Sequence, residues 1–410
     1  MEKRAFLFSG QGSQYVGMGK QIFERSKIAS DIFDEASDAL SFDLKKLCTE
    51  GSKEELTLTC NAQPAILTTS VAMYKMCEEE GIRADIMAGH SLGEISALTC
   101  SMGINFADAV KLVRKRGEFM QQAVPEGKGA MIAVRTRDVE KVQEICKEVS
   151  QNEKKAAISN YNSKVQYVVS GDKEAVDAVA KSLEKEGIRV SYLNVSAPFH
   201  SPLMQPAADM FLEELKKYTY HDLCVPVLSN VTGKPYEGKE AIIENLTRQI
   251  VEPVQWIKCM GYLKMNMVTH AVEAGPGNVL KSLMRHNISD IKTYALDKPD
   301  QVDKLKEYIE KTTIPFLSRA MGIAVATRNQ NWSEDEYQKG VVEPYTKISQ
   351  MQEKIEQENR KATKEEMEEA LNMLKQVFET KKVSKDEQEM RLKQLFRDTR
   401  TEDLFSGLVF

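Results

Sequence analysis

The segment Gly89-His90-Ser91-Leu92-Gly93-Glu94 decides the fold of this chain. An apolar run, Ile86-Met87-Ala88, precedes it and is typical of a buried strand, and Ile95-Ser96-Ala97-Leu98 follows at helical spacing. Gly-x-Ser-x-Gly between a strand and a helix is the sequence form of a nucleophile elbow, a tight turn that exposes the serine hydroxyl. The pattern alone occurs by chance in many proteins, and the strand before it and the helix after it favour catalysis. We therefore predict an α/β protein with Ser91 as nucleophile.

A serine nucleophile needs a base, and the chain has only five histidines. His90 belongs to the turn itself and is expected to point to its other side. His221 lies in a polar stretch, His270 in an apolar run typical of a core histidine, and His286 at an expected helix C-terminus. His200 follows a strand-like run and is bracketed by two prolines, which stiffen its backbone. His200 is therefore the predicted base.

A basic group, Arg114-Lys115-Arg116, ends an expected helix that returns toward the predicted turn. Because the three side chains point to different faces of the helix, at most one or two of them turn inward. A solvated basic face is the simplest interpretation of such a group, so the residues alone do not assign it a binding role.

Short motifs in register along the first three quarters of the chain identify a family resemblance. They are residues 8–14, 61–65, 89–94, 116–117, 129–131, 160–162 with Gln166, 170–171, 199–200, 229–233, Gln249 with 253–256, and 273–277. Each motif is weak by itself, and together they are specific. The chain resembles malonyl-CoA:acyl carrier protein transacylases and the acyltransferase domains of polyketide synthases.

The resemblance implies catalytic roles. Ser91 would attack a thioester carbonyl, and His200 would take its proton and return it to the leaving thiol. The main-chain carbonyl of Gln249 would orient His200. The backbone N–H groups of Gln11 and Leu92 would form the oxyanion hole.

The resemblance also implies residues that select the acyl group. Arg116 would bind the free carboxylate of a malonyl group with its planar guanidinium and so favour malonyl over acetyl. Gln63 would assist at the pocket wall. Phe199 would leave no room for a methyl branch, which favours malonyl over methylmalonyl, although Ala197-Pro198 before it departs from the commonest family pattern.

Composition fits a cytoplasmic enzyme. Seven cysteines without a C-x-x-C pair or metal-ligand spacing indicate reduced thiols and no metal site. The net charge of −5 argues against nucleic acid as a partner. The apolar run at the N-terminus is too short for a signal peptide, and no segment approaches the length of a membrane span.

The expected partner is an acyl carrier protein that carries the phosphopantetheine, with malonyl-CoA as substrate and no cofactor. Carrier proteins of this kind are generally acidic, so docking calls for a local basic patch on a chain of negative net charge. The candidates are Arg114, Lys115, Lys281 and Arg285.

The hydrophobic pattern predicts three parts. Residues 1–127 and 197–300 form a parallel-sheet, hydrolase-like α/β core, and residues 128–196 form a ferredoxin-like subdomain inserted between the serine and the histidine. Residues 301–410 are mixed and then helical, with a capping box at Thr363-Lys364-Glu365-Glu366. Residues 312–332 could pack back on the core. The polar helices after them need a partner for their apolar stripes, either the chain's own surface or another protein.

Three functions remain open from the sequence. The first is malonyl transfer through an acyl-serine ester, supplying a polyketide or hybrid synthase in trans or serving housekeeping fatty-acid synthesis. The second is an editing hydrolase that removes acyl groups from carrier proteins, and the third is a non-enzymatic assembly subunit. Arg116 favours transfer over hydrolysis, and the intact set of Ser91, His200, Gln11 and Arg116 argues against a scaffold. The C-terminal extension favours the synthase in trans.

Overall fold

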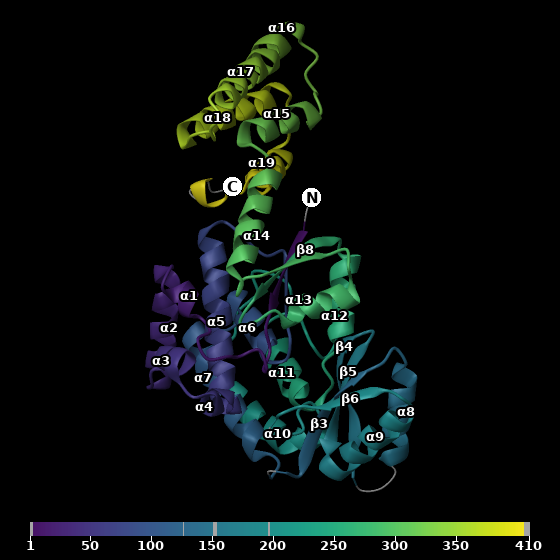
Figure 1. Ribbon diagram of the computed structural model, residues 1–410. Helices are drawn as coiled ribbons and strands as arrows, with labels where there is room; N and C mark the ends of the chain where they lie inside the picture. The colour runs from purple at the N-terminus through teal and green to yellow at the C-terminus, as the bar shows by residue number, and fades with distance from the viewer. Residues whose placement is uncertain (1–2, 126, 151–153, 196, 406–410) are drawn as a thin grey trace. The chain divides into compact units, whose positions relative to one another are not determined.

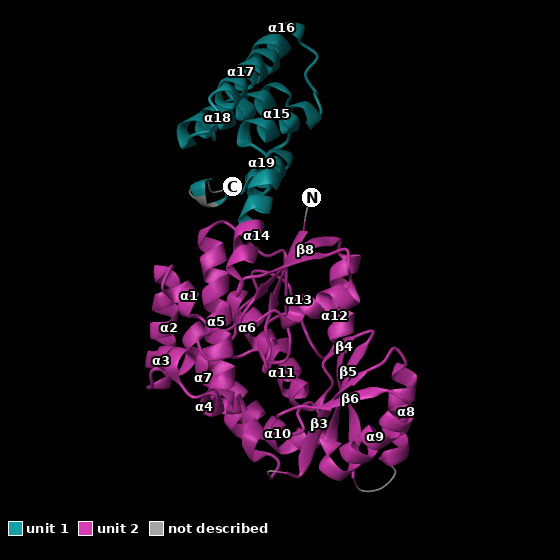
Figure 2. Cartoon of the chain, viewed as in Figure 1, with its two compact units in different colours: residues 1, 305–410 teal, residues 2–304 magenta. Residues whose placement is uncertain are grey.

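The computed structural model describes residues 3–125, 127–150, 154–195 and 197–405 (Figure 1). The chain divides into two compact units, residues 2–304 and residues 305–410 together with residue 1 (Figure 2). The division falls within helix α14 (Pro299–Thr312). No helix in the described ranges is both long and apolar enough to cross a membrane.

The larger unit is built on a five-stranded sheet in which all neighbours are parallel. Its order is β7 (Val227–Leu228), β2 (Ile86–Gly89), β1 (Lys3–Phe8), β8 (Val268–Ala274) and β9 (Lys292–Ala295). The last four residues of β1 are buried without alternation, as expected for a parallel sheet covered on both faces. One face packs on α12 (Trp256–Met265) and α13 (Val279–Asn287). On the other face, Phe6 makes an edge-to-face contact with Tyr74 of α5 (Thr59–Glu79), at 5.1 Å between ring centroids.

A second, antiparallel sheet is inserted between β2 and β7 in the chain. It has the order β4 (Ala156–Ser163), β5 (Gln166–Asp172), β3 (Gly129–Arg135) and β6 (Arg189–Tyr192). Helices α8 (Val139–Val149) and α9 (Lys173–Lys185) pack their apolar stripes on it (Figure 1). This strand order and the alternation of strands and helices are ferredoxin-like. The predicted fold class, a parallel α/β core with this insertion, is confirmed.

Strand β4 ties the inserted sheet to the core. The N–H of Tyr161 donates to Val254 O, and the N–H of Val254 donates to Ser159 O, both at 2.9 Å. The remaining helices of this unit are α1 (Lys20–Phe23), α2 (Lys27–Leu40), α3 (Leu44–Glu50), α4 (Lys53–Thr57), α6 (Leu92–Cys100), α7 (Phe106–Gln122), η1 (Pro202–Met204), α10 (Gln205–Leu215) and α11 (Ala241–Val251).

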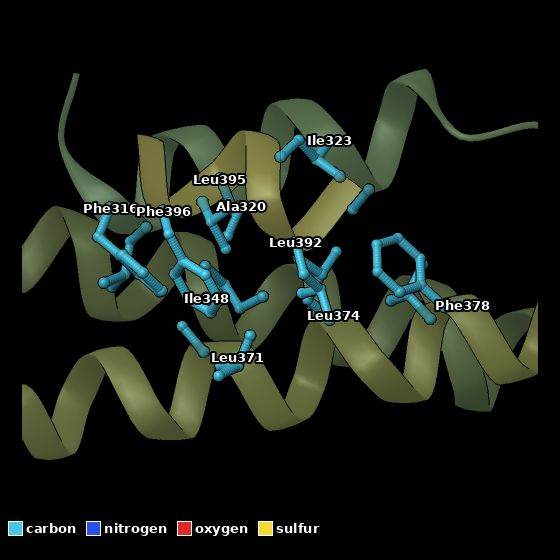
Figure 3. Packing of buried hydrophobic residues seen from close by; sticks show 14 of the residues in the cluster. Phe316, Ala320, Ile323, Ile348, Leu371, Leu374, Phe378, Leu392, Leu395 and Phe396 are labelled. Carbon is cyan, nitrogen blue, oxygen red and sulfur yellow. The ribbon is translucent and has the colours of Figure 1, made fainter. Parts of the chain in front are cut away.

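The smaller unit is helical and has a hydrophobic core of its own (Figure 3). Its elements after α14 are α15 (Phe316–Ala326), α16 (Glu334–Tyr337), η2 (Gln338–Val342), α17 (Glu343–Gln357), α18 (Lys364–Thr380), α19 (Lys385–Thr399) and η3 (Asp403–Phe405). The capping box predicted at Thr363 is confirmed, since its side chain accepts from the N–H of Glu366 while the Glu366 carboxylate accepts from the N–H of Thr363. The ring of Phe396 stacks on that of Phe405 at 4.9 Å.

That residues 312–332 could pack back on the α/β core stays a prediction, and within the smaller unit α15 packs with the other helices of the tail. Its Leu317 and Ala320 are fully buried in the cluster formed with α17, α18 and α19. The C-terminal end of α15 is also held within this unit, because Lys381 Nζ donates to Ala324 O at 2.7 Å and to Thr327 O at 2.8 Å. The stripes of these helices are therefore buried against one another.

Candidate active site

The turn between β2 and α6 places Ser91 at the end of the parallel sheet. Ser91 has φ 51° and ψ −106°, a conformation that L-residues rarely adopt. Close packing of backbone imposes this turn: a Cβ on Gly89 would lie 1.8 Å from the Gly93 carbonyl, and a Cβ on Gly93 would lie 2.0 Å from Phe8 O. Only glycine fits at either position, which is the physical reason for the Gly-x-Ser-x-Gly pattern.

Ser91, His200 and Gln249 form one hydrogen-bonded line. Ser91 Oγ lies 2.8 Å from His200 Nε2, and His200 Nδ1 lies 2.7 Å from the main-chain oxygen of Gln249. Since a carbonyl oxygen only accepts, Nδ1 carries the proton and Nε2 is free to accept from the serine hydroxyl. His200 is buried and has φ 56°, so both residues of the pair have positive φ. This arrangement can activate the serine as a nucleophile.

Arg116 of α7 is 1% exposed and reaches the same serine. Its Nη2 donates to Ser91 Oγ at 3.2 Å and to Gln249 Oε1 at 2.9 Å, and its Nη1 donates to Gln63 Oε1 at 2.9 Å. All of these partners are neutral oxygens. Its Nε is buried and has no hydrogen-bond partner in the described part of the chain. The guanidinium is therefore a buried cation beside the nucleophile.

The two predicted oxyanion donors lie on either side of a close backbone contact. Leu92 is the first residue of α6, so its N–H has no acceptor within the helix. Gln11 lies in the loop after β1, and its side-chain amide donates to Thr59 Oγ1 at 3.1 Å. That loop packs on the turn, because a Cβ on Gly10 would lie 2.4 Å from His90 O.

Phe199 and His90 are the direct chain neighbours of His200 and Ser91. The ring of Phe199, next to His200, is buried. His90 Nε2 contacts Asn162 Oδ1 at 2.8 Å and therefore faces the inserted sheet. His221 and His286 are exposed, and His200 is the histidine that contacts Ser91.

Sequence reasoning missed a polar network beneath the serine. The carboxylate of Glu94, fully buried in α6, accepts from Tyr236 Oη, from Gln249 Nε2 and, at 3.1 Å, from the N–H of Asn230. Asn230 Oδ1 in turn accepts from the N–H of Ser91 at 2.7 Å. The available signal was the position of Glu94, an acidic residue in a helix whose other residues are apolar or small and polar.

Burial dominates the electrostatics of the site. It lowers the pKa of His200 to about 3, and the nearby charge of Arg116 acts in the same direction. It lowers the pKa of Arg116 to about 10, opposed by the charge of Glu94. It raises the pKa of Glu94 to about 7, opposed first by the hydrogen bonds from Tyr236 and Gln249. His200 is therefore neutral, and so able to act as a base, throughout the neutral range.

The parallel sheet, the strained serine and its histidine are typical of an α/β enzyme with a serine nucleophile. The profile of the acyl transferase domain family matches residues 5–297, and the chain belongs to this family. The family match and the relatives below make it an acyltransferase.

Two relatives show which members of the acyl transferase family this chain is similar to. A malonyl CoA-acyl carrier protein transacylase of Bacillus subtilis is 38% identical over 395 residues, which covers 95% of this chain and 99% of the relative. The enzyme of the same name from Escherichia coli K12 is 44% identical over 301 residues, covering 73% of this chain and 97% of its own length. These relatives confirm the family resemblance seen in the motifs.

Solved structures agree with the sequence relatives. The malonyl CoA-acyl carrier protein transacylase of Coxiella burnetii superposes with a TM-score of 0.73 at 36% identity, covering 75% of this chain and 97% of that one. A malonyl-transacylase in complex with its type II PKS acyl-carrier protein has a TM-score of 0.73 at 38% identity and covers 75% and 100%.

The low pKa of His200 predicts an unusual pH profile. A free histidine loses its capacity as a base below its ordinary pKa of about 6.5, whereas burial lowers the pKa of His200 to about 3, so His200 keeps this capacity in mild acid. We expect acylation of Ser91 by p-nitrophenyl acetate, a neutral ester, to show no acid limb from His200 between pH 8 and pH 5. The profile is repeated in Glu94→Gln, because Glu94 titrates near pH 7. A fall in the acylation rate below about pH 6.5 that persists in Glu94→Gln contradicts the prediction.

Proposed function

We propose that this protein transfers a malonyl group from malonyl-CoA to the phosphopantetheine thiol of an acyl carrier protein. The observation that carries the proposal is Arg116, a buried guanidinium that touches Ser91 Oγ and has neutral oxygens as its hydrogen-bond partners. A buried cation of this kind favours an acyl group with a free carboxylate. The names of the relatives support the same substrate.

In the first half-reaction, Ser91 Oγ attacks the thioester carbonyl carbon while His200 Nε2 takes the hydroxyl proton. The carbonyl oxygen becomes an oxyanion, which the N–H groups of Leu92 and Gln11 stabilise. The C–S bond then breaks, and the proton on His200 passes to the departing sulfur of CoA. The product is a malonyl ester of Ser91.

In the second half-reaction, the phosphopantetheine thiol attacks the ester carbonyl and gives its proton to His200. The bond from the carbonyl carbon to Ser91 Oγ breaks, and His200 returns the proton to the serine. A neutral main-chain acceptor at Gln249 suffices to orient His200, since a thiol leaving group needs little help from protonation. This exchange proceeds through the serine ester and uses no cofactor.

The acyl group is selected by charge and by shape. A malonyl carboxylate beside Arg116 would pair the guanidinium and give an acceptor to its unpartnered Nε. Gln63 holds the other side of the guanidinium through Nη1. An acetyl group leaves the cation unpaired, so it binds less well. Phe199, buried next to His200, limits the room for a branch at C2.

A basic hollow on α13 is a candidate docking site for an acidic carrier protein. Lys281, Arg285 and Lys292 line a hollow of about 420 Å³ on α13 and the start of β9. Arg114 and Lys115, the other two predicted docking residues, both pair with the carboxylate of Glu118, whereas Lys281 Nζ donates to the neutral Gln301 Oε1 at 2.6 Å. The hollow on α13 is therefore the proposed docking surface.

The C-terminal unit bears on the biological setting. The alignment with the Bacillus subtilis relative spans 395 residues and therefore includes most of residues 305–410, whereas the alignment with the Escherichia coli relative spans 301. An extension absent from the second enzyme favours a setting other than housekeeping fatty-acid synthesis. A neighbour of the same fold is solved in complex with its type II PKS acyl-carrier protein, which supports a polyketide setting. We propose that the chain loads a polyketide or hybrid synthase in trans.

Arg116→Ala should abolish malonyl selectivity. Removing one partner of a buried ion pair costs roughly 3–5 kcal/mol, so malonyl loading should fall by a factor on the order of 10³ while acetyl loading falls far less. Mass spectrometry of the intact holo carrier protein measures both, with Lys115→Ala, an exposed neighbour on the same helix, as control. Equal losses of malonyl and acetyl loading would contradict the role of Arg116 in binding the malonyl carboxylate. Cleavage of acyl-carrier thioesters to free acid by the wild-type protein indicates the editing hydrolase.

Charge reversal of the docking surface should weaken carrier binding without affecting the chemistry. For Lys281→Glu with Arg285→Glu we expect about a tenfold rise in KM for the carrier protein. Acylation of Ser91 by malonyl-CoA should stay within twofold of wild type. Lys115→Glu is the matched control, because its charge is already paired. An unchanged KM in the double variant rules out this surface.

The synthase setting predicts a preference among carriers. Carrier domains of a polyketide or hybrid synthase should be loaded with at least tenfold higher kcat/KM than the carrier protein of fatty-acid synthesis from the same organism. Parallel loading assays with the full chain measure this ratio. A preference for the fatty-acid carrier would indicate the housekeeping role.

A further inference from the structure

Glu94 holds a position that the acyl-transfer chemistry above does not use. It is the third residue of α6, fully buried, and contacts no reacting atom. Its contacts are three donors: the hydroxyl of Tyr236 on Oε1, and the Gln249 amide nitrogen and the Asn230 N–H on Oε2. A carboxylate only accepts hydrogen bonds, so each neighbour must turn a donor toward it.

This requirement fixes the orientation of the Gln249 side chain. Its Nε2 donates to Glu94 and, at 3.0 Å, to Ser91 O, both of which are acceptors. Its Oε1 is thereby turned to the other side, where it accepts from Arg116 Nη2 at 2.9 Å. A flipped amide would set its NH₂ group against a guanidinium, which has no acceptor.

The arrangement keeps the guanidinium available. A carboxylate in direct contact with Arg116 would compete with a carboxylate on the acyl group. Glu94 instead reaches Arg116 through the neutral amide of Gln249, while its charge favours the protonated form of the arginine. The side chain is held, and its charge is left for the substrate.

Glu94 also supports the turn that carries the nucleophile. The N–H of Asn230 donates to Glu94, and the Asn230 side chain accepts from Ser91 N at 2.7 Å and donates to Gly89 O at 2.7 Å. Gln249 holds Ser91 O from the other side. Both main-chain polar groups of the serine are thus bound by residues that Glu94 binds.

We propose that Glu94 is a positioning residue for acyl selection: by accepting from Gln249 it sets the polarity of that amide and so aims Arg116 at the acyl carboxylate. This inference rests on the malonyl transfer proposed above. Its effect is on the ratio of malonyl to acetyl loading, which a purely structural residue would leave unchanged.

Two substitutions distinguish the effect of the length of the Glu94 side chain from the effect of its charge. Glu94→Gln keeps an amide oxygen in place for Gln249 and Asn230, since the Tyr236 hydroxyl can rotate and accept from the new NH₂ group. Glu94→Asp keeps the charge but withdraws the carboxylate by one methylene. We expect Glu94→Gln to stay within about threefold of wild type in the malonyl-to-acetyl ratio of kcat/KM. Glu94→Asp should lower that ratio at least tenfold.

Substitution of the Gln249 side chain provides a second test of this role of Glu94. Gln249→Met removes the amide but leaves the main-chain oxygen that orients His200. The ratio in Gln249→Met should already be low, and Glu94→Asp added to it should change the ratio by less than twofold, because both act through one path. Thermal unfolding of each variant reports folding separately.

The outcomes are distinguishable. A wild-type enzyme without preference for malonyl overturns the malonyl proposal and this inference together. A wild-type preference that Glu94→Asp and Glu94→Gln alter equally, or multiplicative losses in the double variant, overturns the role of Glu94 alone.

Discussion

The site depends on a backbone contact that tolerates no side chain. Strand β2 and helix α6 meet so closely that Gly89 and Gly93 nearly touch, and the same helix start lies against the end of β1. Ser91 accepts an unfavourable φ because the strands and helix around it are fixed by the core. This contact exposes the Ser91 hydroxyl, places the free N–H groups at the start of α6 beside it, and brings the Gln11 loop to its other side. A side chain at Gly89 or Gly93 would push apart the Ser91 hydroxyl, the N–H groups of α6 and the Gln11 loop.

The second constraint is a buried cation in a site without a directly paired acid. Taking a guanidinium out of water costs several kcal/mol, and the neutral oxygens of Gln63, Gln249 and Ser91 offset only part of this. The charge of Glu94, which Gln249 separates from the guanidinium, opposes the lowering of the Arg116 pKa by burial. Such a site is tuned for binding rather than for stability, since pairing Arg116 directly with an acid would make the protein more stable and the site less useful.

The sequence predicted the parts of the site that have local signatures. Gly-x-Ser-x-Gly reports its own turn, and two prolines mark the stiff segment around His200. Arg116 and Gln249 were assigned only through the family resemblance, because nothing in their local sequence indicates an inward direction. Glu94 and Asn230 lie in the family motifs but were given no role, because their bond joins a carboxylate to a main-chain N–H 136 positions away and a main-chain donor leaves no mark on the sequence.

The same limit applies to the C-terminal helices. Their apolar stripes and the capping box at Thr363 are visible in the sequence, but an apolar stripe does not show which surface it packs against. In the structure, α15 packs with α17, α18 and α19. The hydrogen bonds described for Ser91, His200, Arg116 and Gln249 all end on residues of the larger unit. The site residues named above therefore all belong to the larger unit. The proposed role of residues 305–410 in the choice of carrier is therefore separate from the hydrogen bonding of the nucleophile.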